Sequence, residues 1–329
     1  MVEVWFKYGS TEIFADLEES VEVLNPSGSR HAGYTDEIRR CLEDVVEAVV
    51  VDYVYAVDGY DEAVVSTVGT CTENFPSVEV YVSSWRYADA QTEKSLYEYV
   101  RKLLPEVKKI QPFTGTDKAD PSKTLLFSPA VYWGGRVMGP KDLWKKPSHG
   151  LKLVSPVVGC GGYVAEVMVG EFEEVTQTAV RRAEELSKYS PNNPADVVLV
   201  GGPGHPVDKR FSACLHMASS VSKLEPGKVV VFMFESSEGL GEEWLLKLAK
   251  GEHVQDSELV EQWKDWKAVA EKHKVVLVTA LPSTVVEKIL NARQADTLDQ
   301  AVVYARRVKS REARVLAVPN CVGTCLEGF

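Results

Sequence analysis

The sequence predicts two α/β domains with a cleft between them, and three observations lead to this fold class. The 329 residues are enough for two domains of roughly 100–200 residues each. In the second half, short apolar segments alternate with helical patterns, which is typical of a mainly parallel sheet flanked by helices. Ser190-Pro-Asn-Asn-Pro194 is the clearest linker. We therefore place one domain at residues 1–190 and the other at 195–329.

The first half begins with an expected β-hairpin, because two β-type segments, Val2–Tyr8 and Glu12–Leu17, flank the turn Gly9-Ser10. Thr35 can cap a helix that runs to about Val46. Leu96, Tyr99, Val100 and Leu103 share one face of a helix expected at Ala90–Leu104, and a long helix is expected at Glu171–Lys188. The other expected segments are strands at Glu47–Tyr55, Ala63–Thr70, Val78–Ser84, Leu125–Val131, Leu151–Val158 and Tyr163–Val169, and a loop at Gln111–Lys123.

In the second half, the strand Asp196–Val200 is mostly apolar, as expected for a parallel sheet buried on both faces. A glycine loop follows, and Pro206 begins a helix expected to reach about Lys223. The next strand, Lys228–Phe234, leads into a second glycine loop, Ser236–Gly241. The remaining segments are helices at Ser257–Lys272, Ser283–Leu290 and Thr297–Val308, the last with a capping box, and strands at Val275–Ala280 and Arg314–Val318.

Charge and composition limit the class of partner. The formal net charge is -11, and an acidic surface repels nucleic acid and anionic membranes. Six acidic residues in Met1–Leu24 argue against a signal peptide. No stretch approaches the roughly 18 apolar residues of a membrane span. We therefore expect a cytoplasmic protein with a small anionic substrate, and a homo-oligomer stays open.

The six cysteines are scattered, and only Cys321 and Cys325 lie close together. We expect reduced, mostly buried thiols. The alternative is a disulfide or a soft-metal pair at Cys321 and Cys325, which would need further ligands from elsewhere in the chain.

A ligand site is expected where the two glycine loops follow the strands of the second half, because ligands of open parallel sheets bind beyond the carboxyl ends of the strands. The glycines let backbone N–H groups approach an anion. Lys209 lies in the first helical turn, where a cation opposes the helix dipole, so we expect its charge to act on a ligand. The alternative is a solvated lysine beside tight turns. The candidate binding residues of the two loops are Gly201, Gly202, Ser236 and Gly239.

Several segments resemble the nickel-dependent lactate racemase family. Gly204-His-Pro-Val-Asp-Lys209 is similar to the family's glycine–tyrosine–proline–x–aspartate–lysine segment. Ala195–Gly202 and Glu225–Gly241 resemble the strands and the acidic glycine loop around it. Three further matches are the opening Phe6–Gly9, the helix Glu166–Glu185, and the closing helix Thr297–Val308 with the strand Ala313–Pro319.

The resemblance implies an isomerase that interconverts the stereoisomers of a 2-hydroxy acid. It also implies a nickel-pincer nucleotide that accepts a hydride and returns it on the opposite face. In the family, two histidines act as general bases, a lysine tethers the cofactor and another histidine ligates nickel. These roles are chemically sensible, because imidazole titrates near neutrality and its nitrogen suits nickel.

The sequence departs from this pattern in its first half. The stretch Trp133-Gly134-Gly135-Arg136-Val137 keeps the glycines and the arginine of the family's cofactor segment, but Val137 stands at the tether position. Histidines are missing after the strand at 78–84 and before the double glycine, where Tyr132 stands. His205 replaces the family's tyrosine, which makes it a candidate base, and His149 is the candidate nickel ligand.

The candidate site therefore has three groups. Lys209, His205 and Tyr132 are the candidate catalytic residues. Gly134, Gly135 and Arg136, with the loop residues named above, are the candidate cofactor contacts, and His149 is the candidate metal ligand. The first hypothesis is a racemase or epimerase that acts on a small 2-hydroxy acid or polyol in the inter-domain cleft. The alternative is a catalytically divergent or inactive paralogue that binds a small anion or nucleotide at its glycine loops.

Overall fold

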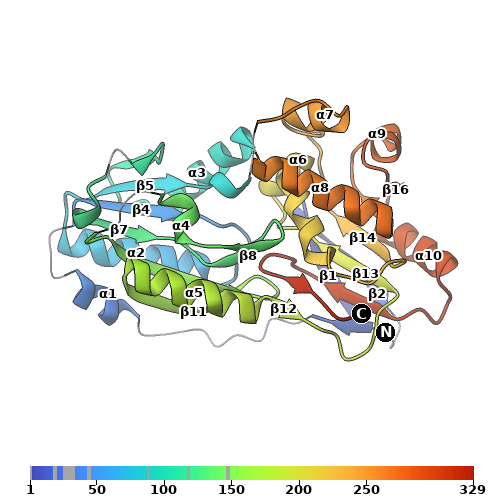
Figure 1. Cartoon of the computed structure of the whole chain (residues 1–329), viewed down its shortest axis with the longest axis horizontal. Coiled ribbons are helices and arrows are strands. Elements are labelled where there is room, and N and C mark those ends of the chain that lie inside the picture. The colour runs from blue at the N-terminus through green and yellow to red at the C-terminus, as the bar shows by residue number, and fades with distance from the viewer. Residues whose placement is uncertain are drawn as a thin grey trace.

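The computed structural model describes residues 2–17, 21–24, 34–42, 46–87, 89–116, 119–145, 149–255 and 257–329. Two α/β lobes lie side by side along the long axis of the molecule (Figure 1). Each is built around a six-stranded sheet flanked by helices. The predicted fold class is confirmed.

The sheet of the N-terminal lobe has the order β11-β10-β7-β4-β5-β6. All neighbours are parallel except the hairpin of β10 and β11. Alternate residues of β4 point to opposite faces, and all five of its residues are buried, so both faces of the sheet are covered. The strands are β4 (Ala48–Asp52), β5 (Glu79–Ser83), β6 (Ile110–Pro112), β7 (Thr124–Phe127), β10 (Lys152–Gly159) and β11 (Tyr163–Glu171).

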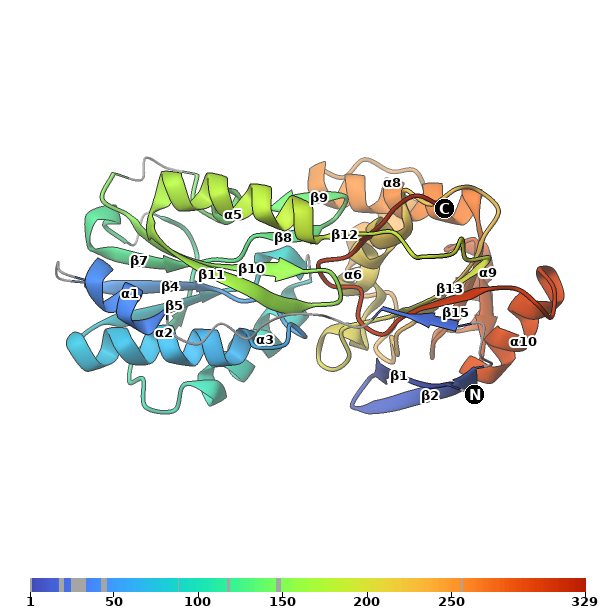
Figure 2. The ribbon, with the colours of Figure 1, turned by 90° about the horizontal axis from the view of Figure 1, so that it is seen from below.

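Helices α1 (Thr35–Cys41), α2 (Tyr60–Asn74) and α3 (Ala90–Leu103) cover one face of this sheet. Helices α4 (Pro140–Leu143) and α5 (Phe172–Leu186) cover the other, and Figure 2 shows α5 and α2 on opposite sides of it. Thr35 is the first helical residue of α1 and not its cap, since Tyr34 precedes it. The helix ends at Cys41, short of the predicted Val46, and residues 43–45 lie outside the described part of the chain.

The predicted strand Ala63–Thr70 is wrong, because this segment lies inside α2. Its β-branched residues favour a strand when taken locally. The helix begins after Gly59, and Val64, Thr67 and Val68 are buried on one side at helical spacing. Burial of that side against the sheet outweighs the small difference in backbone propensity.

The sheet of the C-terminal lobe has the order β16-β15-β14-β13-β17-β3, and every pair is parallel, as predicted. Its last strand, β3 (Val21–Val23), comes from the beginning of the chain. The others are β13 (Val197–Gly201), β14 (Val229–Met233), β15 (Lys274–Val278), β16 (Arg293–Ala295) and β17 (Val315–Val318). Helix α8 (Ser257–Lys272) lies on one face and α10 (Leu298–Val308) on the other (Figure 2). Two shorter helices, α7 (Glu243–Ala249) and α9 (Ser283–Lys288), complete the lobe.

The first residues of the chain pack on this second lobe. The predicted hairpin forms as β1 (Val2–Tyr8) and β2 (Thr11–Leu17). Its apolar side, including Phe6 and Leu17, joins the core of the C-terminal sheet. The N-terminal segment is therefore part of the C-terminal lobe in space, although it belongs to the first half of the sequence.

The helix predicted from Pro206 to about Lys223 is broken into η4 (Val207–Lys209), α6 (Phe211–Cys214) and η5 (Leu215–Val221). Arg210 is extended, and the N–H groups of Phe211 and Ser212 donate to the carbonyls of Gly239 and Leu240 in the second glycine loop. Serine hydroxyls bond to carbonyls three residues back in η5. Phe211, Leu215 and Val221 of this segment are buried. The loop carbonyls accept hydrogen bonds from N–H groups that, in a continuous helix, would donate to carbonyls four residues back.

The remaining short elements lie near the junction of the lobes or at their edges. β8 (Val131–Trp133) and β9 (Arg136–Met138) form a hairpin, and β12 (Lys188–Tyr189) pairs with β18 (Cys325–Leu326). The described part of the chain also has the 3-10 turns η1 (Trp85–Tyr87) and η3 (Pro121–Lys123). All six cysteines are free thiols. No helix in the described ranges is long and apolar enough to cross a membrane.

Candidate functional site

The carboxyl ends of both sheets meet between the lobes. Tyr55 follows β4 of the first lobe, whereas His205 and Lys209 follow β13 of the second, and all three line one pocket. After β17, the Asn320 side-chain amide donates to the Ala56 carbonyl at 2.6 Å. Ligands of parallel sheets bind at this edge, so the candidate site is the space that the two edges share.

The first pocket in this space, here the lysine pocket, has a volume of about 370 Å³. Lys94, Glu98 and Lys102 of α3 line one side, and His205 and Lys209 of the other lobe line the opposite side. Three lysines against one carboxylate make the pocket a favourable place for a small anion, even on a protein that is acidic overall. The volume is within the range of small-molecule sites, roughly 300–1,000 Å³.

The second pocket, here the tyrosine pocket, has a volume of about 430 Å³ and shares Tyr55 and Tyr99 with the first. The Tyr53 hydroxyl donates to Asp61 Oδ1 at 2.5 Å, and the Tyr99 hydroxyl donates to Asp61 Oδ2 at 2.6 Å. Burial, followed by the Asp61 carboxylate, raises the pKa of Tyr53 and Tyr99. Both phenols therefore stay protonated donors. Lys7, Asp58 and Asn320 complete the polar lining.

Lys209 faces the lysine pocket with its side chain 37 % exposed, and its Nζ lies 3.4 Å from Glu238 Oε1. Arg210 Nε donates to the other oxygen of Glu238 at 3.0 Å. The hydrogen bond from Arg210, with a smaller contribution from Lys209, lowers the pKa of Glu238. One carboxylate, Glu238, thus pairs with two cations. The charge of Lys209 is only partly neutralised, and it can also attract an anionic ligand in the pocket.

The Asp208 carboxylate holds the loop that carries His205 and Lys209 in place through hydrogen bonds. Its buried Oδ2 accepts from the N–H of Gly9 at 2.7 Å and of Glu235 at 3.3 Å. Burial raises the pKa of Asp208, and the two backbone donors oppose that rise. The opening hairpin and both glycine loops are therefore joined at one carboxylate, which holds the pocket wall in place.

The predicted loop residues have structural partners. Gly202 N donates to the Met233 carbonyl, Ser236 N to the Asp208 carbonyl and Gly239 N to the Ser236 carbonyl. A Cβ on Gly201 would lie 2.0 Å from the Pro319 carbonyl oxygen. The backbone N–H groups of these three residues are thus already bonded within the protein, and Gly201 is required by close backbone packing.

Tyr132 lies at the contact between the lobes and outside the lysine pocket. It is buried in β8, and its hydroxyl donates to the Ser219 carbonyl of η5 at 3.4 Å. Burial is the main cause that raises its pKa. Tyr132 lines neither the lysine pocket nor the tyrosine pocket, so the structure does not bring it together with Lys209 and His205.

Gly134, Gly135 and Arg136 form the turn and start of β9, with positive φ at both glycines. Cβ atoms at these glycines would meet Gln262 and Asp265 of α8. Arg136 Nη2 donates to Asp142 Oδ1 at 2.8 Å. The segment therefore contacts the second lobe through α8, away from both pockets.

His149 lies at the far end of the first lobe. It is exposed and precedes β10, whose first residue Lys152 pairs with Leu125 near the start of β7. The pockets lie at the other end of these parallel strands, beyond Asp52 of β4. A five-residue strand such as β4 spans roughly 16 Å, so His149 and Lys209 do not reach one small ligand.

The nickel-pincer nucleotide that the family resemblance implies would need a metal ligand and an amine for its tether. Within the described ranges, no three His, Cys, Asp or Glu side chains are arranged to hold a metal. His205 is the one described histidine that lines either pocket, and Val137 offers no amine for a tether. The described donor set therefore does not fit the cofactor as the family holds it.

Several pocket residues were not predicted from the sequence. Lys94, Glu98 and Lys102 recur at intervals of four in one helix, which places them on one exposed face. That spacing was a usable signal for a charged surface. The pairing of Asp61 with Tyr53 and Tyr99 had no such signal, because the three residues come from separate elements that meet only in the fold.

Comparison with known proteins agrees with the resemblance found in the sequence. Residues 190–326 match the lactate racemase C-terminal domain family. The solved structure of the lactate racemase apoprotein from Thermoanaerobacterium thermosaccharolyticum has the same fold, with a TM-score of 0.66 and 12% sequence identity over 99% of this chain and 100% of that chain. No curated protein sequence matches the chain. The predicted resemblance to the lactate racemase family is confirmed.

Proposed function

We propose that this chain, which carries the C-terminal domain of the lactate racemase family, is a racemase- or epimerase-like protein that binds a small 2-hydroxy acid or polyol between its lobes. The observation that supports this most is the lysine pocket, where Lys209 and His205 of one lobe face Lys94 and Lys102 of the other. The site needs both lobes, as expected for a ligand bound in the cleft.

The first role of the site is to bind a carboxylate. Lys209 is held at the pocket wall by the loop that Asp208 fastens, and its charge is only partly offset by Glu238. Lys94 and Lys102 on α3 add positive charge from the facing lobe. An ammonium group in a partly enclosed pocket stabilises an anion more strongly than one in open water.

The second role is proton transfer at the substrate hydroxyl. His205 lines the lysine pocket, and its imidazole has a ring nitrogen that can accept the proton of a substrate hydroxyl and return it. In the adjoining tyrosine pocket, Asp61 offers a carboxylate oriented by two phenol donors. These side chains account for binding and for moving a proton at the hydroxyl.

A second function has one observation in its favour. The described residues do not fit the family's cofactor, since Val137 stands at the tether position and His149 lies at the far end of the lobe. A catalytically divergent paralogue would keep the anion pocket and bind a small anion or nucleotide without turnover. Binding and stereochemical conversion therefore have to be measured separately.

The test uses the purified full chain with D- and L-lactate and a panel of other 2-hydroxy acids. Calorimetry measures binding, and chiral chromatography measures conversion. We expect saturable binding that weakens about ten-fold or more in Lys209→Ala, because a charge-assisted contact is lost, and that is partly restored in Lys209→Arg. Lys247→Ala is the matched control, since Lys247 also pairs with a glutamate but lies in α7.

The outcomes separate the two functions. Binding with conversion that slows in His205→Gln supports the racemase proposal. Binding without conversion overturns it and supports the anion-binding paralogue. If no hydroxy acid binds, or if Lys247→Ala weakens binding as much as Lys209→Ala, the lysine pocket is not the site.

A further inference from the structure

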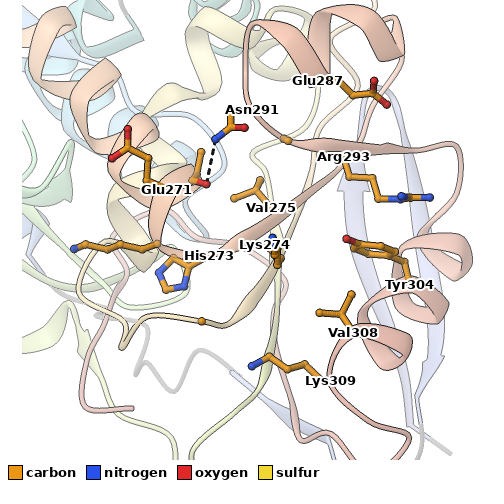
Figure 3. A pocket seen from close by; sticks show the side chains of 14 residues that line it. Glu271, His273, Lys274, Val275, Glu287, Asn291, Arg293, Tyr304, Val308 and Lys309 are labelled. Atoms are coloured by element: carbon orange, nitrogen blue, oxygen red, sulfur yellow. Dashed lines mark hydrogen bonds between the residues drawn. The ribbon is translucent and has the colours of Figure 1, made fainter.

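A larger hollow lies on the outer end of the C-terminal lobe, at the opposite end of the sheet from the lysine pocket. It has a volume of about 890 Å³. Lys274 and Arg293, the first residues of β15 and β16, line it, and Lys309 lines it directly after α10 (Figure 3). Lys272, the last residue of α8, also lines it. We call it the outer hollow. The carboxyl ends of the same strands face the other lobe, so this is a separate site.

Four cations of the outer hollow form no ion pair with the described acidic residues. No ion pair within 4 Å joins Lys272, Lys274, Arg293 or Lys309 to any acidic side chain in the described part of the chain. This is unexpected for a protein with 48 acidic and 37 basic residues. Lys272 and Lys309 can offset the negative ends of α8 and α10. Lys274 and Arg293 begin strands, so helix dipoles do not account for them.

His273 adds a second, independent observation. Its side chain lines the outer hollow and is only 5 % exposed, and neither ring nitrogen has a hydrogen-bond partner among the described residues. A buried polar group without a partner is costly. Burial lowers the pKa of His273 to about 4, with further lowering by Lys272, Lys228 and Lys309. The imidazole is therefore neutral, and an anion beside it would supply the missing acceptor.

Arg293 gives the hollow a group suited to phosphate. Its guanidinium carbon lies 4.4 Å from the centre of the Tyr304 ring, a cation–π contact that orients the planar group at the rim. A guanidinium presents paired N–H donors that match phosphate oxygens, and lysines add point charges. Two carboxylates, Glu271 and Glu287, also line the hollow, so the four cations exceed the acidic groups.

We propose that the outer hollow is a second binding site, separate from the lysine pocket, that takes a phosphorylated small molecule. The buried His273 and four cations that form no ion pair within the described ranges, Arg293 among them, line one space large enough for such a ligand. The ligand neutralises the lysines and accepts a hydrogen bond from the imidazole.

Inorganic pyrophosphate is the probe, added to the full chain at low salt and followed by calorimetry. We expect one saturable site per chain, with affinity about ten-fold weaker in Lys274→Gln and in Arg293→Gln. Lys250→Gln, an exposed lysine elsewhere in the same lobe, is the matched control and should leave binding unchanged. Lys209→Ala should also leave it unchanged, which distinguishes this site from the lysine pocket.

The His273 ring supplies a second readout by NMR. Bound pyrophosphate should raise the pKa of His273 from about 4 towards its ordinary range, because an adjacent anion favours the imidazolium. Absence of saturable binding overturns the proposal, and so does an equal loss in Lys250→Gln. Citrate binding as tightly as pyrophosphate would show a general anion site and overturn the phosphate assignment.

Discussion

At the scale of single residues, His216 joins the two lobes. Its ring stacks on Trp133 with centroids 3.7 Å apart and planes at 11°, and Tyr87 meets it edge-on. His216 Nδ1 is 2.9 Å from the Ala213 carbonyl, and the side chain is buried. Burial lowers the pKa of His216 to about 3. The imidazole is therefore neutral and packs as an aromatic ring between the two lobes.

This pKa predicts a specific pH dependence of stability. In the unfolded chain His216 binds a proton below about pH 6.5, whereas in the folded protein it does so only below about pH 3. Because the unfolded state binds more protons between these pH values, the free energy of unfolding falls as the pH drops through this range. The loss should be on the order of 3 kcal/mol between pH 6.5 and pH 4. Urea unfolding at both pH values measures it.

His216→Phe keeps an aromatic ring but removes the titration, so its stability should depend less on pH over the same range. The control is His253→Gln, because His253 is exposed. An equal pH dependence in wild type and His216→Phe would contradict the assignment.

At the scale of elements, we expect alanine substitutions at two glycines to change the stability of the protein in opposite directions. A Cβ on Gly69 in α2 meets nothing within 4 Å, whereas a Cβ on Gly201 at the end of β13 would lie 2.0 Å from the Pro319 carbonyl oxygen. Gly69→Ala should therefore stabilise the protein by about 0.5–1 kcal/mol, since alanine favours the helix and loses less backbone entropy.

Gly201→Ala should destabilise by about 2 kcal/mol or more, because the backbone of the adjoining loop has to move. Denaturant unfolding of both variants against wild type measures the free energies. Stabilisation by Gly201→Ala would show that the loop after β17 relaxes freely. Destabilisation by Gly69→Ala would mean that α2 contacts a neighbour at that position.

At the scale of the whole molecule, the beginning of the chain completes the second lobe. β3 adds a strand beside β17, and Phe6 and Leu17 of the hairpin are buried against the C-terminal sheet. Residues 190–329 alone would expose this apolar surface to water. We expect that fragment to be unfolded or aggregated when expressed by itself.

Fusing residues 1–24 to the start of residues 190–329 through a flexible glycine–serine linker should restore a folded lobe. Circular dichroism and amide hydrogen exchange of the two fragments compare them directly. If residues 190–329 alone fold as stably as the fusion, the hairpin contributes little to this lobe.

The sequence by itself determined the alternating strands and helices of the second half. Asp196–Val200, Ser257–Lys272 and the capped helix after Thr297 all lie within two residues of the observed elements, because strong local periodicity and capping residues specify them. The same local reasoning was wrong at Ala63–Thr70, where burial on one side overrides β propensity. It also missed the break at Arg210, where a distant loop takes the hydrogen bonds.

Of the candidate site, the motif around Gly204–Lys209 led from sequence alone to the pocket that His205 and Lys209 share. Only the tertiary structure placed α3 opposite that loop, Tyr132 and His149 away from it, and the opening hairpin under Asp208. Local sequence encodes propensity and spacing. Which distant side chains meet depends on how two sheets bury their faces and turn their carboxyl ends toward each other, and no single segment carries that information.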